Sequence, residues 1–567
     1  MKIKQIIALT LIGGSIFFVN GVCENAVLVS AETNTVDEYF QVDGTVLKKY
    51  TGHEEHIVVP DGITVIGTKA FADVRKEIKS IVLPDSVVEI KAFAFVNSTL
   101  EKVICSKNLK TIGMRAFDGS KKLKEISTLE GVEDVASSAF TNTPWLAEQK
   151  KENPVLILGS VLYDAKNYEG DLEIPDTVKT INAGAFSYNK QLRTIVVPNS
   201  VESIGSNAFS GCSNLTSIDI PNSVTEIGAG AFYSCDNLEE IVLPNKLKTI
   251  SQGLFEECTN LKKVVIPDSV TVIEPDSFRV CESLEVLEIP KSVKRIDGDF
   301  SEECPWIKNQ LKKSPMLIIN NNLILVGNLT EENGEKIVIP KGVKRISRRA
   351  FRGSGTTYIR KIEIPNTVTA IGTAAFTYKR IKMIELPNSV KYMGESVFSY
   401  CSELSQVKLS ERLKVLPEDT FWGCKSLKQI TIPESITKLE MDPFVNCNTL
   451  KDFVFSSKMK SVELAAFTNA KGIVIHAPKG SYMETVAKKA NVTFKPLAIN
   501  KTKAKIKKKG TVQLNIATDT TYTTWKSSNS SIASVNSTGK VTGKKKGTAT
   551  ITGVLYGKKY SCKVTVR

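Results

Sequence analysis

Apolar side chains recur along this chain with a long period of about 23 residues. A phenylalanine closes the segment Ile-Gly-x-x-Ala-Phe, or a close variant of it, and five successive copies from Phe186 to Phe278 are 23 residues apart. Between them lies a second constant block, such as Ile218-Asp219-Ile220-Pro221. Alternation of apolar and polar residues is typical of a short strand with one buried face, and the proline ends the strand because it has no N–H.

A unit this small cannot bury its apolar face alone, so successive units must stack. We expect a mainly β solenoid of about sixteen coils, with one long parallel sheet and one continuous column of aromatic rings. The glycine after isoleucine is present in only six of the sixteen coils, so the turn there does not require a positive φ. The defining phenylalanines are Phe71, Phe95, Phe117, Phe140, Phe186, Phe209, Phe232, Phe255, Phe278, Phe300, Phe351, Phe376, Phe398, Phe421, Phe444 and Phe467.

Two interruptions, near residues 141–171 and 301–336, break the predicted solenoid of residues 60–494. Each opens with Pro-Trp, which predicts a short helix with proline at its first position, followed by a β-hairpin that restarts the stack. Residues 32–59 contain a similar hairpin pattern, which we expect to cap the open edge of the first coil. Residues 480–489 predict a helix that closes the last coil.

The C-terminal segment, residues 495–567, differs from the rest in charge. It holds sixteen lysines and arginines and one acidic residue, Asp519, which accounts for the whole formal net charge of +15. Such asymmetry favours a separate module with a polyanionic partner. Alternating short strand patterns predict a small β-sandwich with Trp525 in its core. The candidate polyanion-binding residues are Lys507, Lys508, Lys509, Lys544, Lys545 and Lys546.

For these lysine runs, a solvated charged face is the alternative to a binding site. In an exported protein the polyanion would be an anionic cell-wall polymer or glycan rather than nucleic acid.

Residues 1–31 predict that the protein is exported. They have a basic start, an apolar stretch at residues 6–19 that is too short to span a membrane comfortably, and small residues before Glu32. A lipid-modified Cys23 is the alternative. We therefore expect a secreted or cell-surface protein with no membrane span in the mature chain.

The repeat resembles the BspA-like leucine-rich-repeat family of surface proteins, whose pattern the coils from Leu192 to Phe278 match almost position by position. The C-terminal segment resembles a bacterial immunoglobulin-like domain of group 2, through Trp525-Lys-Ser-Ser-Asn529 and Gly547-Thr-Ala-Thr-Ile551. The resemblance implies a leucine-rich-repeat solenoid followed by an immunoglobulin-like sandwich. It also implies an adhesive scaffold without shared catalytic residues, which binds protein or glycan ligands on host or bacterial surfaces.

The cysteines and histidines do not form a pattern that predicts a catalytic or metal site. Seven cysteines sit three residues after the repeat phenylalanine and predict a ladder of small buried side chains, with disulfides as the alternative. His53, His56 and His476 are too far apart along the stack to form a catalytic triad or a metal site, so no cofactor is expected.

Acidic residues in the middle coils, including Glu239-Glu240 and Glu302-Glu303, predict a solvated stripe rather than the paired carboxylates of a glycosidase. The outward strand position gives the candidate ligand-facing residues. We predict a binding protein without enzymatic activity, with a structural spacer or a glycan-active enzyme as alternatives. The candidates are Asp219, Glu288, Glu363, Glu385 and Lys408.

Overall fold

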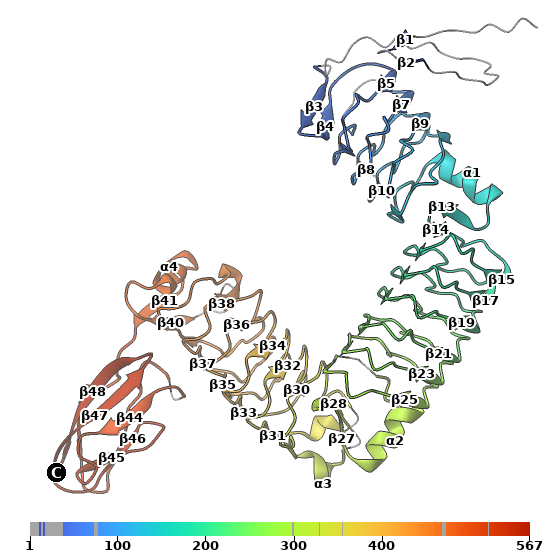
Figure 1. Ribbon diagram of the computed structural model, residues 1–567. Coiled ribbons are helices and arrows are strands. Elements are labelled where there is room, and N and C mark those ends of the chain that lie inside the picture. The colour runs from blue at the N-terminus through green and yellow to red at the C-terminus, as the bar shows by residue number, and fades with distance from the viewer. Residues whose placement is uncertain are drawn as a thin grey trace, which may run out of the picture.

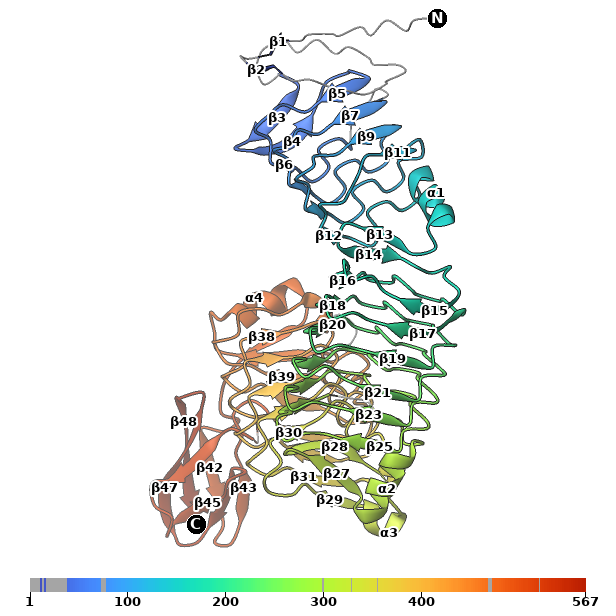
Figure 2. The same cartoon turned by 45° about the vertical axis from the view of Figure 1, so that its right-hand side comes forward.

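The computed structural model describes residues 11–12, 15–16, 38–72, 78–297, 300–327, 329–353, 355–467, 472–519 and 521–567. Apart from β1 (Leu11–Ile12) and β2 (Ser15–Ile16), the predicted signal peptide lies outside the described residues. The predicted fold class is confirmed, since the chain is a curved parallel β-solenoid followed by a small β-sandwich (Figures 1 and 2).

Each coil contributes two strands to two different sheets. In β19 (Ser217–Asp219) Ile218 is buried and its neighbours are exposed, as the alternation predicts. The two-residue strand β20 (Glu226–Ile227) follows and pairs with the corresponding strand of the preceding coil. The first strands follow the outer side of the curve and the second strands its inner side (Figure 1). The inner sheet was not predicted, because two residues are too few to show a strand period.

The outer strands are β5 (His56–Val58), β7 (Ser80–Val82), β9 (Lys102–Ile104), β11 (Glu125–Ile126), β15 (Gly170–Glu173), β17 (Leu192–Val196), β19, β21 (Glu240–Val242), β23 (Lys263–Val265), β25 (Val286–Glu288), β29 (Lys336–Val338), β31 (Lys361–Glu363), β33 (Met383–Glu385), β35 (Gln406–Lys408), β37 (Gln429–Thr431), β39 (Asp452–Val454), β40 (Val474–Ala477) and β41 (Thr493–Pro496). The inner strands are β4 (Val46–Tyr50), β6 (Val65–Ile66), β8 (Glu89–Ile90), β10 (Thr111–Ile112), β12 (Asp134–Val135), β14 (Val161–Asp164), β16 (Thr180–Ile181), β18 (Ser203–Ile204), β20, β22 (Thr249–Ile250), β24 (Val272–Ile273), β26 (Arg295–Ile296), β28 (Asn322–Val326), β30 (Arg345–Ile346), β32 (Ala370–Ile371), β34 (Tyr392–Met393), β36 (Val415–Leu416) and β38 (Lys438–Leu439).

The solenoid is divided into three stacks, and the prediction of one long sheet was wrong. Helix α1 (Pro144–Glu152) and helix α2 (Pro305–Lys313) interrupt it where Pro-Trp predicted helices. A hairpin begins each stack: β3 (Phe40–Asp43) with β4, β13 (Leu156–Leu158) with β14, and β27 (Met316–Ile319) with β28. Short helices follow at α3 (Glu331–Gly334), Thr356–Tyr358 and Leu464–Phe467, and α4 (Tyr482–Lys489) packs against β40 and β41.

The solenoid has about 19 turns rather than sixteen. In a typical coil the phenylalanine N–H donates to the alanine carbonyl of the next coil, as Phe186 does to Ala208. Tyr50, Ala165 and Val326 make the same bond in the turns that begin the three stacks. These three turns carry no phenylalanine, so a count based on that residue omits them.

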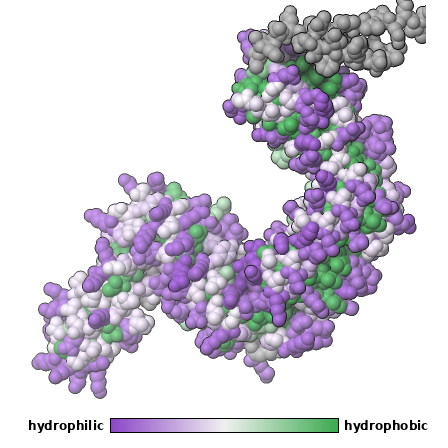
Figure 3. Space-filling model, in the orientation of Figure 1, coloured by the Kyte–Doolittle hydropathy of each residue, from purple (hydrophilic) through white to green (hydrophobic). Residues whose placement is uncertain are grey.

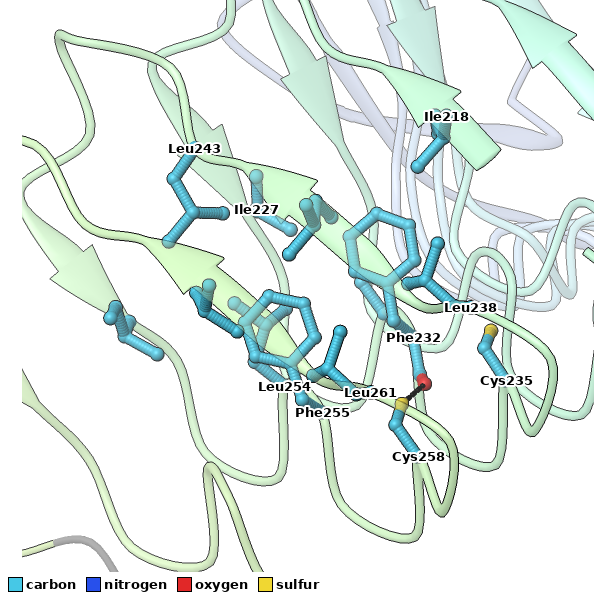
Figure 4. Packing of buried hydrophobic residues seen from close by; sticks show 14 of the residues in the cluster. Ile218, Ile227, Phe232, Cys235, Leu238, Leu243, Leu254, Phe255, Cys258 and Leu261 are labelled. Atoms are coloured by element: carbon cyan, nitrogen blue, oxygen red, sulfur yellow. Dashed lines mark hydrogen bonds between the residues drawn. The ribbon is translucent and has the colours of Figure 1, made fainter. Parts of the chain in front are cut away.

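The aromatic column likewise runs in segments rather than continuously. Neighbouring stacked rings lie between 4.8 and 5.8 Å apart, centroid to centroid. Trp145 from α1 packs on Phe140 and Trp306 from α2 packs on Phe300, so a tryptophan ends each of the first two segments. Buried side chains accordingly form three separate solenoid cores, and Figure 4 shows part of the middle one.

The glycine after isoleucine has no positive φ, as predicted, and Gly228 is an example. The left-handed residue comes two positions later, where Gly230 has a φ of 61° and Asn207 has a φ of 56° in another coil. Gly228 instead permits close approach of the backbone, since a Cβ there would lie 2.4 Å from the amide nitrogen of Ser206 in the preceding coil.

The cysteine ladder consists of buried free thiols, which confirms the prediction of small apolar side chains. Each thiol also donates a hydrogen bond to the phenylalanine carbonyl of the preceding coil. Cys258 Sγ lies 2.9 Å from the Phe232 oxygen, the bond drawn in Figure 4, and Cys235 Sγ lies 3.1 Å from that of Phe209. The thiols thereby satisfy backbone carbonyls in the interior, which would otherwise be costly to bury.

We expect the ladder thiols of the native protein to be unreactive toward a thiol reagent at pH 8. Burial raises the pKa of Cys212, Cys258 and Cys401 to about 12, so the reactive thiolate is scarce at that pH. The measurement is thiol titration of a chain beginning at Glu32, before and after unfolding in guanidinium chloride. Rapid modification of seven thiols in the folded chain would contradict this expectation.

The C-terminal domain is a sandwich of two sheets, as predicted. One sheet contains β42 (Lys503–Ile506), β48 (Lys558–Val566), β47 (Gly547–Leu555) and β44 (Thr524–Ser527), and the other contains β43 (Thr511–Gln513), β46 (Lys540–Gly543) and β45 (Ala533–Val535). Trp525 is half-buried against this core, and a Cβ at Gly539 would lie 2.9 Å from its ring. The tryptophan therefore packs as a core residue.

Candidate binding surfaces

The outer sheet holds the five residues predicted to face a ligand. Asp219 and Glu288 lie in the middle stack on β19 and β25, and neither forms an ion pair with any residue that the structure describes. The other three lie on the successive strands β31, β33 and β35 of the third stack. Helix α2 and the hairpin of β27 and β28 separate the two groups, so the five residues form two surfaces rather than one.

The three residues of the third stack are paired with neighbours. Glu363 lies 2.8 Å from the Lys361 ammonium and 3.0 Å from that of Lys336, and these two contacts hold the pKa of Glu363 below its usual value. Glu385 forms an ion pair with Lys408 on the next strand. These exposed pairs contribute little to stability, but they leave less free charge here than the sequence suggests.

Exposed valines share the outward strand position in the middle stack, and the charge-based prediction missed them. Val196, Val242 and Val265 are 55%, 63% and 40% exposed. Asp219 and Glu288 therefore share their column with exposed valines, and Figure 3 shows hydrophobic patches along the outer edge of the curve. The repeat register placed these valines in the same column, so the signal was present in the sequence.

The two lysine runs come together at one end of the sandwich, which we call the basic tip (Lys507–Lys509 and Lys544–Lys546). The Lys509 N–H donates to the carbonyl of Gly543, and the Gly543 N–H donates to that of Gly510. These backbone bonds join two loops whose lysines are all exposed. Within the described part of the chain, none of the six lysines forms an ion pair. Figure 3 shows hydrophilic side chains over this end of the domain.

The opposite end of the sandwich is docked on the solenoid, a contact the sequence did not predict. The Tyr522 hydroxyl accepts from the Leu409 N–H and donates to the Leu409 carbonyl, both at 2.8 Å. The Tyr556 hydroxyl donates to the Ile432 carbonyl at 2.6 Å. Both tyrosines also pack in an apolar cluster around Val454. The domain therefore covers part of the outer sheet at the last coils, next to Lys408.

Asp519, the only acidic residue of the basic domain, holds the docking loop. Its buried carboxylate accepts hydrogen bonds from the N–H groups of Thr521, Tyr522 and Thr523, and from the Thr523 hydroxyl at 2.6 Å. A carboxylate with several donors orders a short loop strongly. Asp519 thus places the Tyr522 ring for its contact with the solenoid and is unavailable to neutralise the basic tip.

Among the described residues, no group of three or more histidine, cysteine or acidic side chains is placed to hold an ion. The His476 Nε2–H donates to the Asp452 carboxylate at 3.0 Å, while His56 contacts Ser80 at the other end of the solenoid. In the parts of the chain that the structure describes, no helix has the length and apolar character needed to cross a membrane.

Comparison with solved structures shows likeness to leucine-rich-repeat proteins from bacteria. A leucine rich cell surface protein from Faecalibacterium prausnitzii is 23% identical, with 80% of this chain and 97% of that chain covered and a TM-score of 0.23. A leucine-rich repeat protein from Eubacterium ventriosum is 22% identical, covering 53% and 77%, with a TM-score of 0.34. The pneumococcal vaccine antigen PcpA is 15% identical, covering 80% and 95%, with a TM-score of 0.21. No curated protein matches the chain.

Sequence families match both parts of the molecule. The family described as bacterial Ig-like domain (group 2) matches residues 493–564. The family described as BspA type leucine rich repeat region matches residues 49–169, 179–308 and 329–451 in six copies, which is more than half of the chain. Those residues form the three stacks whose coils carry the repeat phenylalanine described above. The chain therefore belongs to the BspA-type leucine-rich-repeat family, with a C-terminal bacterial immunoglobulin-like domain.

Proposed function

We propose that this protein is a secreted or cell-surface binding protein whose basic tip holds it on anionic polymers of the cell envelope. The solenoid then presents its outer sheet to protein or glycan ligands on host or bacterial surfaces. The convergence of two lysine runs, 35 residues apart in sequence, at the end of the domain away from the solenoid carries this proposal. An unpaired cluster of six cations attracts a polyanion over a range set by the ionic strength.

The geometry of the domain allows the basic tip and the outer sheet of the solenoid to bind different partners. Strands β47 and β48 each have nine residues and run from the docked end to the basic tip. At about 3.3 Å per residue, they separate the tip from the solenoid by roughly 25–30 Å. A polymer held at the tip therefore leaves the valine-rich part of the outer sheet open. We propose no catalytic role, since repeat coils of this family present surfaces rather than a deep pocket with facing carboxylates.

The test is a salt-titrated binding assay on isolated bacterial wall material. We expect replacement of the six tip lysines by glutamine to weaken binding about tenfold or more at 0.15 M salt, and to flatten its salt dependence. A matched control removes the same charge from exposed solenoid lysines and should bind as the unmodified chain does. The control positions are Lys121, Lys124, Lys246, Lys248, Lys291 and Lys294.

Equal loss in both variants would show that net charge, not the tip, governs binding. Retention by the tip variant would place the wall contact on the solenoid. If the tip holds the protein on the wall and the solenoid binds no other surface component, the structural-spacer alternative is favoured. A chain ending near Phe494 should fail to bind wall material for the same reason as the tip variant.

A further inference from the structure

A hollow of about 800 Å³ opens on the third stack, on the side of the coils that follows Ala-Phe, away from both sheets. It lies among the coils that contain β30 to β36 in Figure 1. Its volume is in the range of small-molecule sites. Neither the predicted ligand-facing residues nor the basic tip contributes to it. The side chains used in the argument below are Tyr378, Tyr400, Trp422, Arg349, Lys379 and Asp419.

An open aromatic face forms one wall of this hollow. The Tyr378 and Tyr400 rings are parallel within 5° and lie 4.8 Å apart, so each covers one face of the other. The Tyr400 ring also rests on Gly423, where a Cβ would come within 3.0 Å of it. Tyr378 is nevertheless 63% exposed. Its remaining face is therefore a flat, braced surface, suited to the C–H-rich face of a sugar ring.

Cationic groups surround this surface. Lys379 is only 5% exposed, and its ammonium donates to the Thr356 hydroxyl at 2.8 Å. Burial lowers its pKa to about 8, because the charged amine has lost much of its hydration. Arg349 and Arg352 also line the hollow, and Asp419 is the one acidic side chain among its described lining residues. Glu302 acts electrostatically on Lys379 from outside this lining. Burial, together with nearby acids, raises the pKa of Asp419. The described lining of the hollow therefore places three cationic side chains and one acidic side chain within reach of a ligand.

A buried donor at the same site lacks an acceptor. The indole N–H of Trp422 is enclosed and makes no hydrogen bond with any residue that the structure describes. Leaving such a group unpaired is costly. A ligand rich in hydroxyl and carboxylate oxygens supplies the kind of acceptor that this wall lacks. Together with the aromatic face and the cations, this observation distinguishes the hollow from an ordinary surface groove.

We propose that this hollow binds a sugar with a carboxylate, with its C–H face on Tyr378 and its carboxylate toward Lys379 and Arg349. The proposal rests on the proposed function in one respect, that the solenoid is the ligand-presenting part, and it names the class of that ligand. A uronic acid and a sialic acid share this chemistry. The cationic tip of the C-terminal domain lies elsewhere and plays no part in it.

Calorimetric titration of the full chain tests the proposal with three probes. These are a hyaluronan tetrasaccharide for the uronic acids, sialyllactose for the sialic acids, and maltotetraose as a neutral sugar. We expect at least one acidic probe to bind about tenfold or more tightly than maltotetraose, and the tighter of the two identifies the source. Binding of none of them, or equal binding of the neutral sugar, would overturn the proposal.

Variants locate the site. Tyr378→Ala should weaken binding of the acidic probe about tenfold, and its exposed position means that the chain still folds. The matched control is Tyr188→Ala, because Tyr188 is 72% exposed at the same repeat position of the middle stack. Lys379→Met should abolish the preference for acidic over neutral sugar. If Tyr378→Ala binds the probe as the unmodified chain does, the site is wrong.

The wall-binding assay distinguishes an error in the proposed saccharide site from an error in the proposed function. Tyr378→Ala should retain salt-sensitive wall binding through the basic tip. Loss of saccharide binding with wall binding intact supports the hollow as a separate site. If no chain binds a saccharide and wall binding is intact, the proposed saccharide site is wrong and the proposed envelope contact is unaffected.

Discussion

Replacement of Phe232 by alanine should lower the free energy of unfolding of the middle stack by about 3–5 kcal/mol. The ring is fully buried, with the rings of Phe209 and Phe255 at centroid distances of 5.4 and 5.8 Å. Alanine would remove contacts to the coils on both sides and leave a cavity that the stacked backbone cannot close. Figure 4 shows the rings of Phe232 and Phe255 with neighbouring buried leucines.

The measurement is hydrogen exchange followed by mass spectrometry in increasing denaturant. Because the three stacks have separate cores, the loss of protection should concentrate between residues 162 and 325 and spare the first stack. Tyr188→Ala, an exposed aromatic in the same stack, is the control and should change stability little. A loss below about 1 kcal/mol for Phe232→Ala, or uniform loss of protection across all stacks, would contradict this account.

Substitution of both Tyr522 and Tyr556 by phenylalanine should release the immunoglobulin-like domain from the solenoid. The change removes only two hydroxyl groups, yet it leaves the N–H and carbonyl of Leu409 and the carbonyl of Ile432 without these partners. Each buried group left unpaired costs about 1–3 kcal/mol. Small-angle scattering should then show a larger maximum dimension and a broader distribution of shapes than for the unmodified chain.

Tyr560→Phe is the control, because Tyr560 is half-buried in the same cluster and its hydroxyl makes no bond to the solenoid among the described residues. High pH offers a second measurement on the unmodified chain. Burial raises the pKa of both Tyr522 and Tyr556 above the usual 10. Docking is therefore complete below pH 10 and weakens above it, since only the undocked tyrosines ionise readily. An unchanged scattering profile in the double variant would refute the docking role.

The repeat fold was predictable because its signal is local and recurs. The repeat phenylalanine, the proline that follows most outer strands and the Pro-Trp dipeptides each mark their own coil. Stacking then repeats the same contact many times. The first turn of each stack was not predicted, because three different residue types, Tyr50, Ala165 and Val326, take the place of the phenylalanine there. Their turns are defined by hydrogen bonds to the next coil rather than by side chains.

The candidate surfaces were predictable only in part, for a related reason. The basic tip follows from composition, since one segment holds all the excess charge. The docking tyrosines make contacts 113 and 124 residues away along the chain, each only once, so no periodicity marks them. The ion pairs of Glu363 and Glu385 depend on which lysine lies on the adjacent strand. Charge at an outward position therefore predicts exposure better than it predicts availability to a ligand.

The run of β47 and β48 from the docked end to the basic tip has a mechanical consequence. If the tip is held and the solenoid is pulled by whatever it has bound, the force acts along these two strands. Lys546 leads directly into β47, and β42 (Lys503–Ile506) leads directly into Lys507, so the backbone itself carries the force between the basic tip and the docked end. The pairing of Gly547–Leu555 with Lys558–Val566 keeps the strands aligned under this load. The parallel pairing of β42 with β48 adds a further ladder along the same axis. The immunoglobulin-like domain, the smaller of the two parts, can thus carry tensile load.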